Sequence, residues 1–137
     1  MPDTEKNKRG VADMNALPGV AYPGGAGVVH TIRGVVVPGD LIDDGCSNAA
    51  ADGGGCIEQL ANYTAVFGVH PGEGGATASH YPTFDGVGNH DGGNSTDAAS
   101  GLVRREVISR NRRRDAVHAK ISNYSLASNG LHYSWDW

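Results

Sequence analysis

Two polar segments carry the residues that could do chemistry, and each follows a short apolar run that ends in glycine. The first is Gly-Asp-Leu-Ile-Asp-Asp-Gly at residues 39–45, and the second is Gly-Asn-His-Asp-Gly at residues 88–92. We interpret each as a loop at the carboxyl end of a β-strand, which is the edge of an open α/β sheet where ligands collect. Asp40 and Asn89 offer the oxygen atoms that hard divalent cations prefer. Together they predict half of a metal site.

The second segment also supplies groups that could act on a substrate. His90 follows Asn89 directly and can point toward the substrate rather than the metal. Asp91 could hold the His90 ring by a hydrogen bond and raise its basicity. Such a set suits a two-metal hydrolase, in which the ions generate a hydroxide and clamp an in-line displacement at phosphorus. The alternative for Asp40 is an ordinary turn or helix cap, because a Gly-Asp pair by itself is common.

The two segments, in this order, resemble the calcineurin-like metallophosphoesterases. That family's pattern is Asp-x-His, then Gly-Asp, then Gly-Asn-His-Asp or Gly-Asn-His-Glu, then a lone His and Gly-His-x-His. Residues 39–40 match the second block and residues 88–91 match the third. Residues 81–87 and 131–137 also have the look of the family, so the resemblance covers residues 28–137.

The resemblance implies a function, a set of roles and a fold. Asp40 would bridge two divalent metal ions, Asn89 would bind the second ion, and His90 would contact the phosphate or protonate the leaving group, with Asp91 orienting it. The ions would be Mn, Fe, Zn or Mg, and the substrate a phosphomonoester or a phosphodiester. The fold would be a four-layer α/β/β/α sandwich with a mixed sheet.

The other blocks of the family pattern are missing. The only early candidate for the first block is residues 3–5, Asp-Thr-Glu, which lack the histidine and a preceding strand. His118 and His132 are the only histidines after His90, and neither lies in a Gly-His-x-His motif. We therefore expect residues 1–137 to be a single incomplete phosphoesterase domain, cut at both ends and inactive alone. The alternative is a non-catalytic binding or structural domain that retains the fold.

The elements that would position these residues follow from periodicity and turn signals. The sequence predicts, in order, a helix, a strand, a helix, a strand, a helix and a hairpin, which together indicate an α/β layered fold with a mixed sheet. Their expected ranges are 5–16, 28–37, 56–69, 82–88, from Asp97 or Ser100 to about Arg113, and two strands within 119–137 joined by Ser128-Asn129-Gly130.

Side-chain patterns add expectations about burial. The β-branched run in 28–37 is typical of a buried parallel strand. In the helix over 56–69 we expect Ile57, Leu60, Tyr63 or Thr64, and Phe67 to form the buried face. The alternating Tyr133, Trp135 and Trp137 of the hairpin predict a core-facing aromatic side.

Composition limits the classes of partner. The chain has 137 residues, 21 of them glycine, and a net charge of −4, which argues against general affinity for nucleic acid. One basic cluster is the exception, and we interpret it as a solvated helix end rather than a phosphate-binding or nucleic-acid-binding surface. The cluster consists of Arg104, Arg105, Arg110, Arg112, Arg113 and Arg114. No apolar run approaches the roughly 18 residues of a transmembrane helix, so no membrane partner is expected.

The two cysteines do not decide between an oxidising and a reducing cellular compartment. Cys46 and Cys56 could close a loop of about ten residues as a disulfide, or remain two thiols. A bridge would indicate an oxidising compartment, so a secreted or periplasmic location. The sequence also has three Asn-x-Ser/Thr sequons, at Asn62, Asn94 and Asn123, and its first residues lack the apolar stretch of a signal peptide.

Overall fold

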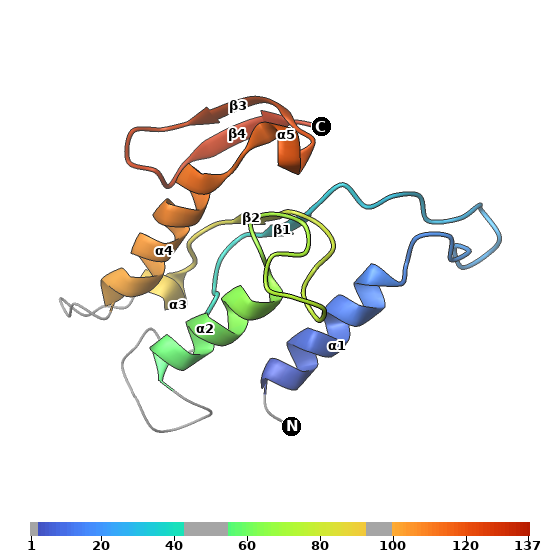
Figure 1. The fold of residues 1–137 in the computed structure, drawn as a ribbon, viewed down its shortest axis with the longest axis horizontal. Helices are drawn as coiled ribbons and strands as arrows, with labels where there is room; N and C mark the ends of the chain where they lie inside the picture. Colours follow the sequence, from blue (N-terminus) through green and yellow to red (C-terminus); the bar gives the residue numbers. More distant parts are fainter. Residues whose placement is uncertain (1–2, 43–54, 93–99) are drawn as a thin grey trace.

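The computed structural model describes residues 3–42, 55–92 and 100–137, which form a small α/β fold (Figure 1). The elements follow the predicted order, apart from two short additional helices, α3 and α5. They are α1 (Asp3–Asn15), β1 (Val35–Val37), α2 (Cys56–Val66), β2 (Thr83–Asp85), α3 (Asn89–Gly92), α4 (Ser100–Arg113), α5 (Ala116–Ala119), β3 (Ser122–Leu126) and β4 (Tyr133–Asp136). None of the helices in the described ranges is long and apolar enough to cross a membrane.

The strands of the described residues form two separate pairs instead of the single mixed sheet that we expected. β1 pairs with β2 in parallel, with Val36 opposite Phe84, and β3 pairs with β4 in antiparallel fashion. β1 is also much shorter than the predicted strand over 28–37. Within that range Val28 only makes an isolated bridge to Ala21. β-Branched side chains favour a strand, but a strand forms only where a neighbour accepts its backbone hydrogen bonds.

The largest apolar cluster packs α2 against α4 and the segment after β1. Its buried members are Leu41, Ile42, Cys56, Leu60, Tyr63, Val103 and Val107. On α2 the buried face is set by Cys56, Leu60, Tyr63 and Val66, whereas Ile57 is 71% exposed. The expectation that Ile57 joins the core was therefore wrong.

The hairpin forms as predicted, and its aromatic side covers β2. Gly130 adopts a left-handed φ of 74° in the turn, and its amide donates to the carbonyl of Ala127. Trp135 stacks on Phe84 with ring centroids 4.3 Å apart. Trp137 meets the Phe84 ring edge-on but stays 46% exposed, so only part of this side is core. The buried parallel strand expected around Val36 is likewise only partly covered, because that side chain is 59% exposed.

Cys56, the first residue of α2, is disulfide-bonded. The only other cysteine of the chain, Cys46, lies outside the described residues. A disulfide is the alternative that favours an oxidising compartment.

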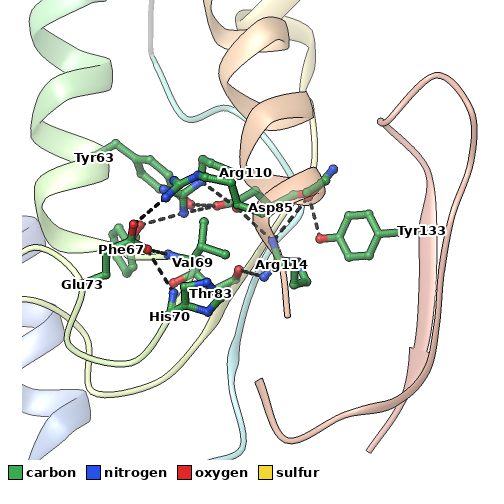
Figure 2. A network of polar contacts seen from close by, with 12 residues as sticks. Tyr63, Phe67, Val69, His70, Glu73, Thr83, Asp85, Arg110, Arg114 and Tyr133 are labelled. Atoms are coloured by element: carbon green, nitrogen blue, oxygen red, sulfur yellow. Dashed lines mark hydrogen bonds and ion pairs between the residues drawn. The ribbon is translucent and has the colours of Figure 1, made fainter. Parts of the chain in front are cut away.

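A buried polar network joins α2 and α4 to β2 (Figure 2). At its centre is Asp85, the last residue of β2, whose side chain is fully buried. Arg110 donates to both carboxylate oxygens of Asp85, from Nε at 2.9 Å and from Nη2 at 3.0 Å. The Tyr63 hydroxyl donates to Oδ1 at 2.5 Å, and Arg114 Nη2 lies 3.4 Å from Oδ2. Burial, reinforced by the Asp85 carboxylate, raises the pKa of Tyr63, so its hydroxyl keeps the proton that it donates.

The same two arginines also bind backbone carbonyls. Arg110 Nη2 donates to the carbonyl of Phe67 at 2.7 Å, and Arg114 donates to the carbonyl of Thr83. Both side chains are almost fully buried, so the expectation of a solvated helix end was wrong for them. Although burial opposes the charge, Asp85 raises the pKa of Arg110 and keeps it charged. Arg112 and Arg113 are exposed, as expected.

Removing one partner of this network should destabilise the folded protein. We expect Arg110→Met to lower the free energy of unfolding by about 3–5 kcal/mol, because it leaves the Asp85 carboxylate buried without its main partner. The matched control Arg112→Met, on the exposed face of the same helix, should change stability by no more than about 0.5 kcal/mol. Urea unfolding followed by circular dichroism measures both. Equal losses in the two variants would contradict the assigned role of Arg110.

Candidate functional site

Residues 39–42 of the first polar segment lie beside residues 88–92 because β1 and β2 are adjacent and parallel. Both strands therefore end at the same edge of their sheet. Asp40 lies shortly after the end of β1, and Asn89 begins α3 just beyond β2. The structure thus places Asp40 next to Asn89 and His90, at the carboxyl edge that the sequence predicted.

Glycine permits the close approach of the two loops. A Cβ atom at Gly39 would overlap the backbone of Gly88, and a Cβ at Gly88 would overlap the backbone and the carboxylate of Asp40. Gly39 also has a φ of 148°, which disfavours residues with a side chain. The glycine that precedes each polar motif is therefore needed where one loop contacts the other.

Asp91 is the residue that ties the loops together. Its side chain is fully buried, and its Oδ1 accepts hydrogen bonds from the amides of Leu41 at 2.7 Å and Ile42 at 3.2 Å. Its Oδ2 accepts from the amide of Gly88 at 2.9 Å. The sequence assigned Asp91 to orienting the His90 ring, whereas these contacts show a carboxylate that binds backbone amides of both loops. Sequence patterns carried no signal for this role, since every residue other than proline supplies a backbone amide.

Asp40 makes the reciprocal contact. Its Oδ1 accepts a hydrogen bond from the amide of His90 at 3.0 Å. In the part of the chain that the structure describes, Oδ2 of Asp40 has no hydrogen-bond partner. Asp40 also has a left-handed φ of 55°, a conformation that is uncommon outside glycine and that aspartate tolerates. Its side chain is exposed, as are those of Asn89 and His90, so all three are accessible to a ligand.

The oxygen atoms of Asp40 and Asn89 are of the type that hard cations bind, but there are too few of them to complete a coordination shell. Asp40 and Asn89 present a carboxylate and an amide oxygen at one edge, whereas Ca²⁺ or Mg²⁺ takes six or more oxygen ligands, including waters. Within residues 3–42, 55–92 and 100–137, no three His, Cys, Asp or Glu side chains form a group that could hold a metal ion. Residues 3–5, the weak candidate for the first block, lie at the start of α1.

Comparison with protein-family models, with curated proteins and with solved structures finds no match to this chain.

Crowding between the loops should make Gly88 intolerant of a side chain. We expect Gly88→Ala to destabilise the fold by about 1–3 kcal/mol, because the methyl group would collide with Asp40. The control is Gly101→Ala on α4, where, among the described residues, the nearest atom to a Cβ would be the tip of Arg105 at 3.9 Å. In a helix that change should be neutral or stabilising by up to about 1 kcal/mol. Thermal unfolding compares the two variants, and an equally mild effect at Gly88 would contradict the close packing of the loops.

Replacing the Asp91 carboxylate should separate the loops. Asp91→Asn retains one acceptor oxygen but presents an NH₂ group where Oδ2 or Oδ1 accepted a backbone amide. We expect a loss of about 1–3 kcal/mol in stability, with faster hydrogen exchange at the amides of Leu41 and Gly88. Amide exchange measured by NMR checks this. Unchanged protection of both amides would show that Asp91 does not hold the loops together.

Proposed function

We propose that this chain contributes to a metal-dependent phosphoesterase that hydrolyses phosphomonoesters or phosphodiesters at a dinuclear centre. The observation that carries the proposal is the convergence of Asp40 with Asn89 and His90 at the carboxyl ends of adjacent parallel strands. Their order along the chain is the order in the calcineurin-like metallophosphoesterases, which the motifs resemble.

The accessible atoms support a role for each residue. Asp40 would use its second carboxylate oxygen to bridge two divalent ions, while its first oxygen stays on the His90 amide at 3.0 Å. Asn89 would bind the second ion through its amide oxygen, and His90 would contact the phosphate or protonate the leaving group. The bound ions, Mn, Fe, Zn or Mg, would supply a hydroxide at neutral pH and offset the charge on the phosphate.

Further ligands have to come from outside the described residues, because a dinuclear centre needs more donors than Asp40 and Asn89 provide. A four-layer α/β/β/α sandwich, built on a larger sheet that includes β1 and β2, would bring such ligands to the same edge. Because the other motif blocks of the family pattern are missing from its 137 residues, we expect this chain alone to be inactive. The disulfide at Cys56 supports an oxidising compartment for the protein.

A second candidate is a non-catalytic binding or structural domain that retains this arrangement. It is favoured by Asp91, whose carboxylate accepts three backbone amides, and by the bond from the His90 amide to Asp40. These contacts join the loops through groups of the protein itself.

Manganese binding distinguishes the two candidates. We expect substoichiometric Mn²⁺ to broaden the NMR signals of Asp40, Asn89 and His90 before others, because Mn²⁺ relaxes nearby nuclei. Asp40→Asn combined with Asn89→Ala should abolish this local effect, and the control Asp13→Asn, an exposed acid on α1, should not. Broadening spread over many exposed carboxylates, or unchanged in the double variant, would favour the non-catalytic domain. A p-nitrophenyl phosphate assay of the same samples should show no turnover.

A further inference from the structure

Two histidines lie together at the other end of β2, away from the candidate phosphoesterase site. His70 belongs to the segment after α2, and His118 belongs to α5. Their ring centroids are 5.4 Å apart. The amide of Thr83, the first residue of β2, donates to the carbonyl of Gly68 at 3.2 Å. The segment that carries His70 is therefore anchored at the amino end of β2, whereas Asp40 and Asn89 lie beyond its carboxyl end.

His118 is held in an orientation that suits metal binding. Its Nδ1 lies 3.0 Å from Oδ2 of Asp115. A carboxylate can only accept in this contact, so Nδ1 is the ring nitrogen that carries the proton. This leaves Nε2 as the lone-pair nitrogen, and a carboxylate behind an imidazole is the usual support of a metal-ligating histidine. The side chain is 68% exposed, so an ion can reach it.

His70 offers a second imidazole whose backbone is fixed. Glu73 Oε2 accepts the amides of Val69 at 2.7 Å and His70 at 3.1 Å, and Arg113 donates to Glu73 Oε1 at 2.7 Å. Nδ1 of the His70 ring is buried and has no hydrogen-bond partner among the described residues. Figure 2 shows Glu73 and His70 beside the Asp85 network.

The spacing of the rings matches two imidazoles on one ion. With Zn–N bonds of about 2.0–2.1 Å and tetrahedral geometry, two ring centres would lie roughly 5.2 Å apart, close to the observed 5.4 Å. Imidazole nitrogen is a preferred ligand of Zn²⁺, in contrast to the oxygen donors at the other edge. We infer that His70 and His118 form a Zn²⁺ site that links the segment after α2 to α5, with water completing the coordination.

The inference does not depend on the proposed phosphoesterase function, because it shares no residue with that site. Only two protein ligands bind the ion, so we expect modest affinity and a stabilising role. An ion that binds the folded chain but not the unfolded one should raise the melting temperature as its concentration rises.

The test is titration of the full chain with ZnCl₂, followed by long-range ¹H–¹⁵N NMR of the six imidazole rings. We expect one equivalent of Zn²⁺ to shift the ring nitrogens of His70 and His118 and to leave those of His30 and His132 in place. His70→Gln and His118→Gln should each weaken Zn²⁺ binding at least tenfold, as measured against a chromophoric chelator. His132→Gln, an exposed histidine at the end of the hairpin loop, is the matched control and should bind as the parent chain does.

Three results would overturn the inference. They are equal shifts at all histidines, binding unchanged in both His70→Gln and His118→Gln, or equal weakening by His132→Gln. Asp40→Asn separates the two sites, since it should leave Zn²⁺ binding at the histidine pair unchanged while removing the local Mn²⁺ effect at the strand ends. Circular dichroism confirms that each variant is folded before the binding results are compared.

Discussion

The buried carboxylate of Asp85 is the constraint on which the rest of the structure depends. Taking an ion out of water costs several kcal/mol, and that cost is offset only by well-placed partners. Tyr63 comes from α2, and Arg110 and Arg114 come from α4 or directly follow it. The backbone carbonyl of Asp85 also accepts the hydroxyl of Tyr133 at 2.9 Å, which brings in β4. One residue on a three-residue strand therefore fixes the positions of two helices and the hairpin.

Holding β2 in this way also positions the loop that follows it. Residues 88–91 follow Asp85 after Gly86 and Val87. They meet the loop after β1 through reciprocal contacts. Asp91 accepts amides from both loops, and Asp40 accepts the amide of His90. The proposed ligands are thus arranged by hydrogen bonds within the protein, which is the preorganisation that a binding site requires. A scaffold of this kind serves equally well in the second candidate, a non-catalytic domain.

Much of the fold could be predicted where the signals are local. The helices near 5–16, 56–69 and 100–113 follow from apolar spacing, and the hairpin follows from its Asn-Gly turn. The location of Asp40 and Asn89 at strand ends also needed only local patterns. The arginines could not be placed by charge alone. Yet Val103, Val107, Arg110 and Arg114 share one helical stripe, and all four are buried, so periodicity contained a signal that the charges obscured.

The sequence by itself determined which segments are helical, where the hairpin turns, and which loops carry metal-binding residue types, because these depend on near neighbours in the chain. Only the tertiary structure decided the length of β1, the burial of Arg110 and Arg114, and the binding of Asp91 to backbone amides. The tertiary structure also decided that the ring centroids of His70 and His118 lie 5.4 Å apart. Each of these depends on a partner tens of residues away, and a pattern read along the chain does not reveal which distant groups will meet.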